Sequence, residues 1–214
     1  MQTLFLRPVW RLPVVVCLML PSLAAQRNDW EIVLGVRVGP ITRESTLESL
    51  KRQFGAANVR QEMLSDEVQE YEGTVIYPDT PARRLAITWG DSGHPSEIDV
   101  GSLQQIGTGA WRGPKGITIG TGLLQLERLN GRAFHLAGFA WDYCGTVTSW
   151  DGGRLAPLKA GGLERGLDPG LREPTSAQSK FYEQVTGDGF FPSSHPAMQA
   201  LNPRVSYFRV FFPK

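Results

Sequence analysis

The chain has 214 residues, with 22 Lys and Arg against 21 Asp and Glu, and 41% of its residues are apolar. The near-neutral charge excludes a basic nucleic-acid module, and the apolar content excludes an acidic disordered chain. The 24 glycines and 15 prolines exceed average usage but stay below the level typical of disorder, so they indicate a loop-rich globular protein.

The N-terminal segment predicts an export signal. Arg7 and Arg11 precede the apolar run 14–20, and small residues follow up to residue 25. This order is typical of a secretory signal peptide, whereas a spanning helix needs about 20 apolar residues. We therefore expect residues 1–25 to be removed, with an uncleaved anchor or a lipid-modified Cys17 as alternatives. The mature chain then has 20 basic and 21 acidic residues and one cysteine, so it has no internal disulfide.

Two segments of the chain match each other at a shift of 76 residues. Residues 41–55 and 117–131 have six identical positions among fifteen, including an Ile-Thr start, two leucines and a final glycine. The match predicts an internal repeat that organises most of the mature chain.

Each matched segment predicts a short helix with one apolar face. Ser45 and Thr121 stand where an N-cap is expected, and Ser45 with Glu48 forms a capping-box pattern. Leucines follow at helical spacing, and Gly55 and Gly131 end each helix, because glycine adopts a positive φ at low cost. Helices this short are not stable alone, so each is expected to pack on a sheet.

Runs rich in β-branched and aromatic residues predict the strands of that sheet. Residues 31–38 form the expected opening strand, and residues 74–77 and 84–89 form a hairpin around a Pro-rich turn. In the second copy, residues 146–150 form a strand whose returning partner is delayed to residues 205–212.

We predict an α+β fold of two tandem repeats, each a short helix packed on an antiparallel β-sheet. The first repeat covers 26–100 and the second covers 114–214, and a Gly-rich junction at 101–113 joins them. An insertion at about 156–203 interrupts the second repeat and carries a short helix over 178–185.

This arrangement resembles the fold of the β-lactamase-inhibitor protein and of the small outer-membrane assembly lipoproteins. The resemblance covers residues 38–90 and 114–155, and its motif is the Ile-Thr start, a capping residue, two leucines and a glycine. The aromatic segment at 141–153 is also similar to one in uncharacterised secreted bacterial proteins. The resemblance implies an exported protein of this tandem-repeat fold.

The string Gly90-Asp91-Ser92-Gly93 resembles the nucleophile segments of chymotrypsin-like proteases and of Gly-Asp-Ser hydrolases. No histidine precedes Ser92, and Asp188 lies seven residues before His195 rather than in the Asp-x-x-His spacing of the second family. Its four residues and the following proline all favour turns. We therefore predict a turn here, with a small serine hydrolase using Ser92 and His195 as an alternative function.

The sequence predicts neither a metal site nor a cofactor site. His94, His135 and His195 are isolated, and no paired cysteines provide ligands at metal-binding spacing. The glycines at 107, 109 and 113 lack the strand, spacing and helix of a dinucleotide site.

The segment 139–151 is unusually aromatic and has two interpretations. In a strand, Phe139, Trp141 and Tyr143 share one face, because alternate side chains do so. These rings either fill the core or form an exposed platform for a protein or a saccharide. On the second interpretation the binding residues are Trp141, Tyr143, Trp150 and Asp151.

These observations favour a non-catalytic extracytoplasmic protein, periplasmic or secreted, that binds another envelope or secreted protein. A saccharide-binding module using Trp141 and Trp150 is a further alternative. We expect no nucleic-acid partner, no cofactor and no stable membrane span after signal cleavage.

Overall fold

The computed structural model describes residues 29–65, 69–101, 109–160, 163–170 and 174–212. The expected signal at 1–25 with Cys17, and residues 102–108 of the Gly-rich junction, lie outside these ranges. Within them the chain forms five α-helices and three antiparallel sheets, so the predicted α+β class is confirmed. No helix of the described ranges is long and apolar enough to cross a membrane.

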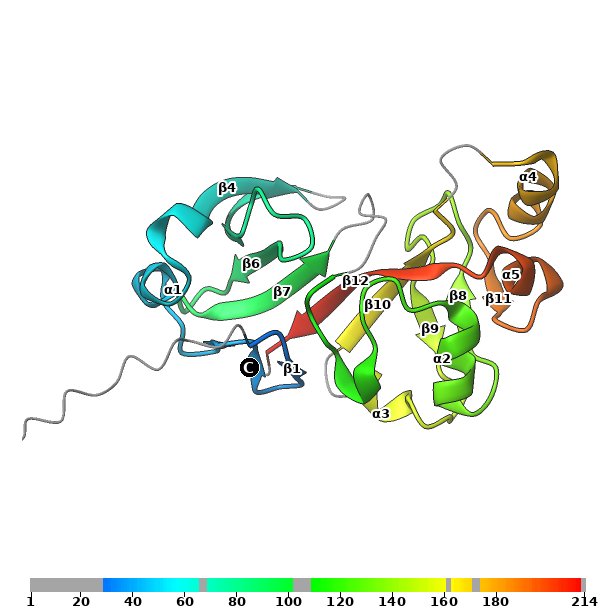
Figure 1. Ribbon diagram of the computed structural model, residues 1–214, viewed down its shortest axis with the longest axis horizontal. Coiled ribbons are helices and arrows are strands. Elements are labelled where there is room, and N and C mark those ends of the chain that lie inside the picture. The colour runs from blue at the N-terminus through cyan, green and yellow to red at the C-terminus, as the bar shows by residue number, and fades with distance from the viewer. Residues whose placement is uncertain (1–28, 66–68, 102–108, 161–162, 171–173, 213–214) are drawn as a thin grey trace, which may run out of the picture.

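A six-stranded antiparallel sheet runs through the middle of the molecule (Figure 1). Its spatial order is β10 (Leu163–Asp168), β12 (Arg204–Phe211), β7 (Pro95–Gly101), β6 (Leu85–Trp89), β5 (Glu70–Ile76) and β4 (Val59–Ser65). One three-stranded sheet consists of β1 (Ile32–Val33), β2 (Arg37–Val38) and β3 (Ile41–Thr42). The other has the order β11 (Phe190–Pro192), β8 (His135–Ala137) and β9 (Val147–Ser149).

The sheet β11-β8-β9 lies beside the outer strand β10 of the central sheet. Leu167 of β10 donates its backbone N–H to the carbonyl of Gly145 at 3.0 Å, and Thr146 forms an isolated antiparallel bridge with Gly166. In Figure 1, β4 and α1 therefore stand at one end of the molecule, and β8, β11 and α4 stand at the other.

The helices are α1 (Leu47–Phe54), α2 (Leu123–Asn130), α3 (Ala156–Ala160), α4 (Ser176–Glu183) and α5 (Pro196–Leu201), with short 3-10 turns at Ala56–Asn58 and Pro114–Gly116. The predicted capping box of Ser45 and Glu48 is wrong by one residue. Thr46 is the N-cap of α1 and forms the capping box with Ser49. The N-cap of α2 is Gly122, which offers no side-chain oxygen.

Ser45 and Thr121 instead close the turn before each helix. The backbone N–H of Thr42 donates to the Ser45 hydroxyl at 3.0 Å, and that of Thr118 donates to the Thr121 hydroxyl at 2.9 Å. The matched segments therefore share a local turn, in which a side chain replaces a backbone acceptor. The duplication of the whole unit stays a prediction.

Several predicted strands are confirmed and others are corrected. The hairpin is present as β5 and β6, with Thr74 opposite Ile87. Residues 31–38 form β1 and β2 rather than one strand, because Gly35 takes a positive φ of 66° and reverses the chain. The strand over 205–212 is present as β12, but it pairs with β10 and β7 and not with β9.

The predicted insertion at 156–203 is not wholly an insertion. It contains β10, which pairs with β12 along six positions and completes the central sheet. The helix predicted over 178–185 is present as α4, which begins slightly earlier, at Ser176.

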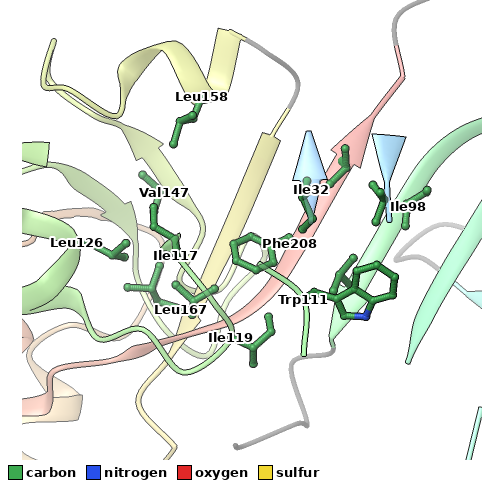
Figure 2. Close-up of a cluster of buried hydrophobic side chains, with 14 of the residues drawn as sticks. Ile32, Ile98, Trp111, Ile117, Ile119, Leu126, Val147, Leu158, Leu167 and Phe208 are labelled. Carbon is green, nitrogen blue, oxygen red and sulfur yellow. The ribbon is translucent and has the colours of Figure 1, made fainter. Parts of the chain in front are cut away.

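The core lies on one face of the central sheet and continues across β12 into the second half of the chain. One row of paired, buried residues crosses five strands: Val59, Ile76, Leu85, Val100 and Phe208. Figure 2 shows the Phe208 ring in the middle of the core, with Trp111 and Ile98 on one side and Ile117 and Leu167 on the other. The two halves therefore share a single core.

Candidate binding site

The aromatic segment forms a loop and not a strand. β8 ends at Ala137, and residues 139–145, which we call the aromatic loop, turn back before β9. Ala140 and Tyr143 have left-handed φ values of 55° and 62°, which no β-strand accommodates. The predicted shared face of Phe139, Trp141 and Tyr143 is therefore wrong.

The base of the aromatic loop is fixed by backbone hydrogen bonds to two distant segments. Phe139 donates to the Val185 carbonyl at 2.9 Å and accepts from Gly187 at 3.0 Å. At the other end of the loop, Gly145 accepts from Leu167 of β10 at 3.0 Å. The loop tip is thus presented from a rigid base, which reduces the ordering cost of binding.

Three exposed aromatic side chains lie at this corner of the molecule. Trp141 and Tyr143 on the loop are 54% and 72% exposed, and Phe190 on the neighbouring β11 is 69% exposed. Phe190 pairs with Ala137, directly before the loop. These three residues, called the aromatic corner below, are three of the five large apolar side chains exposed in the described ranges.

Trp150 does not belong to the aromatic corner. Its side chain is only 4% exposed, and its ring lies 4.7 Å from the ring of Phe134 in the core. The prediction that Trp150 forms part of an exposed platform is therefore wrong, because its ring packs in the core.

A cavity of about 410 Å³ opens next to the aromatic loop. Two residues of the loop line it, together with the end of β10, the prolines at 169 and 174, and one side of α4. The lining residues are Phe139, Cys144, Asp168, Pro169, Pro174, Ser179, Tyr182 and Glu183. Because Trp141 and Tyr143 stand between two lining residues in the chain, the aromatic corner and the cavity form one candidate site.

The cavity combines aromatic walls with acidic groups. The rings of Phe139 and Tyr182 stack with centroids 5.7 Å apart and planes 12° apart. Burial, and then the neighbouring Cys144 and Asp168, raise the pKa of the Tyr182 phenol, so it remains a hydrogen-bond donor at neutral pH. Asp168 and Glu183 add carboxylates, and no Lys or Arg is among the described lining residues.

Asp151 belongs to a separate polar cluster on β8 and β9. Its carboxylate accepts from the Ser149 hydroxyl at 2.6 Å and lies 2.7 Å from the Nδ1 atom of His135. The Ser149 bond first, and then His135, lower the pKa of Asp151 below its ordinary value of 3.8. Asp151 therefore orders this sheet edge, and it is not among the described residues that line the cavity.

The Asp151→Asn variant should show a stability loss that depends on pH. A carboxyl whose pKa is lowered by folding stabilises the protein above its unfolded pKa and loses that effect as pH falls through the folded value. Urea unfolding should give a loss of about 1 kcal/mol at pH 6, discounted for partial exposure, and a smaller loss at pH 2.5. The exposed Asp142→Asn serves as a control. An equal loss at both pH values would contradict the assignment.

The structure does not bring Ser92 and His195 together. Ser92 lies on an exposed turn between β6 and β7, closed by a bond from Gly93 to Gly90 at 2.9 Å. His195 caps α5, where its Nδ1 accepts from the Ala197 N–H at 3.1 Å. Figure 1 shows α5 at the end of the molecule opposite β6. The predicted turn is present, and no observation favours the hydrolase alternative.

Metal ligands do not gather in the described ranges, where no group of three or more His, Cys, Asp or Glu side chains is placed to hold an ion. The glycine at 107 of the considered dinucleotide pattern lies outside those ranges.

Sequence reasoning identified Phe139, Trp141 and Tyr143 but missed Phe190, Asp168 and Tyr182. Phe190 had a signal, because Phe190-Phe191 stands between Gly189 and Pro192 as a short strand does. Asp168 and Tyr182 had none, since only the tertiary fold brings them to the aromatic loop.

Comparison with known proteins finds a distant structural likeness. No protein-family model matches the chain, and no curated protein matches it. The crystal structure of the uncharacterised protein YfeY from Escherichia coli matches over 84% of this chain and 98% of that chain, with 17% sequence identity and a TM-score of 0.44.

Proposed function

We propose that the protein is a non-catalytic extracytoplasmic binding protein, and that its partner is another envelope or secreted protein. The observation that carries the proposal is the aromatic corner, in which two exposed rings lie on a loop that lines a cavity and the third lies on the strand paired with the start of that loop. Trp and Tyr are enriched among the residues that dominate binding energy at protein interfaces.

The geometry of the loop supports a binding role. Ala140 and Tyr143 both hold left-handed backbone conformations within seven residues. Such conformations cost free energy and persist where the surroundings impose them, which is frequent at ligand-binding segments. Large aromatic side chains are normally at least partly buried. The exposure of Trp141 and Tyr143, on a loop whose backbone conformation costs free energy, therefore supports selection for contact with a partner.

The extracytoplasmic location is supported by the N-terminal sequence. Two arginines, a short apolar run and small residues occupy 1–25, in the order typical of an export signal. A single cysteine in the remaining chain is compatible with an oxidising compartment, because the protein depends on its core rather than on disulfides.

Quantitative affinity capture tests the proposal. The purified protein is immobilised and incubated with an envelope extract of the cells that produce it, and captured proteins are compared between variants by mass spectrometry. We expect Trp141→Ala/Tyr143→Ala to lose at least 90% of one specific partner, because truncated interface aromatics commonly cost about 2 kcal/mol or more each.

Met63→Ala is the matched control, since Met63 is 64% exposed on β4 at the opposite end of the molecule. Capture of the same proteins in the same amounts by the wild type and the double variant would contradict the proposal.

A saccharide ligand is the second candidate, and the exposure of Trp141 is the observation that favours it. The predicted second platform residue, Trp150, is buried, so a saccharide would stack on Trp141 and hydrogen-bond to the cavity acids. Glycan-array binding that disappears in Trp141→Ala, together with no captured protein, would select this candidate.

A further inference from the structure

We propose that β4, the outer strand of the central sheet, pairs with β4 of a second copy of this chain. The two strands run antiparallel about a two-fold axis at Gln61, so the two central sheets join into one. β4 and the aromatic corner lie at opposite ends of the molecule (Figure 1). The pairing therefore leaves the aromatic corner of each copy free, and it does not rest on the proposed function.

The outer edge of β4 has no partner strand among the described residues. β4 is the last strand of the central sheet, whereas β10 at the other margin is bonded to the segment at Gly145 and Thr146. β4 pairs with β5 along its whole length without a bulge, and it contains no proline. Bulges and prolines are common means of blocking an edge, so β4 is a regular template for another strand.

The hydrogen-bond pattern shows which backbone groups of β4 face outward. The Tyr77 N–H donates to the Asn58 carbonyl at 2.8 Å, in the register that continues the pairing of β4 with β5. Backbone groups alternate in direction along an antiparallel strand, so the even-numbered residues of β4 bond to β5. The N–H and C=O groups of Gln61 and Met63 therefore point away from the sheet, and no other described segment bonds to them.

Charge selects the register of the pairing. Outward-facing residues must meet outward-facing residues, so one strand can shift against the other only by two residues at a time. With Gln61 opposite its own copy, Arg60 of each chain lies directly opposite Glu62 of the other. A shift in either direction places Arg60 opposite Arg60 or Glu62 opposite Glu62. Of these three registers, only the one centred on Gln61 pairs opposite charges, and like charges directly opposite each other are destabilising.

The side chains of Arg60 and Glu62 are placed to make this contact. They are 52% and 30% exposed, and side chains at directly opposed positions have Cβ atoms about 4.5–5.5 Å apart. Within the chain, Arg60 donates to Asp79 at 3.1 Å and to Glu62 at 3.4 Å. The second bond is long and weak, so Arg60 can exchange it for Glu62 of the second copy and keep Asp79.

The same register uses the outward backbone groups and the exposed Met63. Gln61 exchanges two backbone hydrogen bonds with its copy, and the Met63 N–H donates to the Val59 carbonyl of the other chain on each side of the axis. The Val59 N–H remains bonded to Ala56. The Met63 side chain, now 64% exposed, comes to lie opposite Val59 and loses contact with water.

Analytical ultracentrifugation of the purified protein tests the inference by exchange of charge. We expect the wild type to form a concentration-dependent dimer. Arg60→Glu and Glu62→Arg should each weaken dimerisation at least tenfold, because each places like charges opposite one another. An equimolar mixture of these two variants, and the double variant Arg60→Glu/Glu62→Arg, should dimerise within threefold of the wild type, because both restore opposite charges. Arg128→Glu makes the same charge change on the exposed side of α2 and should stay within twofold.

Disulfide trapping tests the register independently of charge. Gln61→Cys places two cysteines at paired positions whose Cα atoms lie about 5.5 Å apart, which is within the range of a disulfide. Met63→Cys is the matched control, because the two copies of residue 63 are not opposite each other. We expect mild oxidation to convert Gln61→Cys into a covalent dimer and to leave Met63→Cys and the wild type, which contains Cys144, as monomers in denaturing electrophoresis.

Sedimentation of the wild type as a monomer at millimolar concentration would overturn the inference, whether or not β4 binds a different protein. A mixture of Arg60→Glu and Glu62→Arg that dimerises no better than either variant alone, or equal trapping through residues 61 and 63, would also overturn it. These measurements leave Trp141 and Tyr143 unchanged, so their failure is distinct from a failure of the proposed function.

Discussion

Replacing Phe208 by alanine is expected to lower the free energy of unfolding by about 3–5 kcal/mol, the usual cost of a large core aromatic truncated to alanine. Phe208 is fully buried on β12, in the middle of the row of apolar residues that crosses the central sheet. It contacts the core where the clusters of both halves meet (Figure 2). Its removal leaves a cavity that neither half can fill by a local shift.

Phe211→Ala is the matched control for this prediction. Phe211 lies on the same strand but on the opposite face, and it is only half-buried. Its truncation should cost about 1 kcal/mol, close to the average for point mutations. Urea unfolding, followed by both fluorescence and circular dichroism, measures the two values. Two separate transitions, or a Phe208→Ala cost no larger than that of Phe211→Ala, would contradict a single shared core.

Gly145→Ala should destabilise the protein by about 2–4 kcal/mol, because the new side chain would occupy a left-handed backbone position with no free space around it. Gly145 has a positive φ of 66°, and a Cβ atom added there would overlap the backbone oxygen of Leu167. That oxygen belongs to β10 and cannot rotate away. The substitution therefore separates the end of the aromatic loop from β10 and breaks the bond that fixes the loop.

Gly93→Ala isolates the part of this effect that comes from backbone conformation. Gly93 has a similar φ of 72°, but a Cβ atom added there would meet no other atom within 4 Å. The substitution should cost about 1 kcal/mol, the ordinary cost of forcing alanine into a left-handed conformation. Thermal unfolding of both variants gives the comparison, and equal costs would show that the loop is not tightly packed against β10.

The sequence predicted the elements whose signals are local. The leucine spacing located α1 and α2, and the alternating aromatic run located β12. Two predictions were wrong for different reasons: the N-cap of α1, where two neighbouring residues carry the same hydroxyl group, and β10, whose strand contains polar residues. Thr46 and not Ser45 caps α1, although either hydroxyl suits the role. The outer strand β10 carries three charged residues, so its sequence does not show the apolar pattern typical of a strand.

The candidate site was predictable only in part, because its parts come from distant segments. The aromatic loop was visible as a cluster of rings, but its left-handed residues, Ala140 and Tyr143, are not types that indicate such a conformation. Asp168 and Tyr182 reach the loop only through the pairing of β10 with β12 and the position of α4. Long-range packing, and not local propensity, forms the cavity.

Site-specific photo-crosslinking in the cells that produce the protein tests the central claim most directly. A photoreactive phenylalanine is introduced at Trp141, at Phe190 or, as a control, at Met63, and covalent adducts are identified after irradiation. We expect positions 141 and 190 to form an adduct with the same extracytoplasmic protein and position 63 to form none with that protein. Adducts at position 63 alone, or none at 141 and 190, would contradict binding through the aromatic corner.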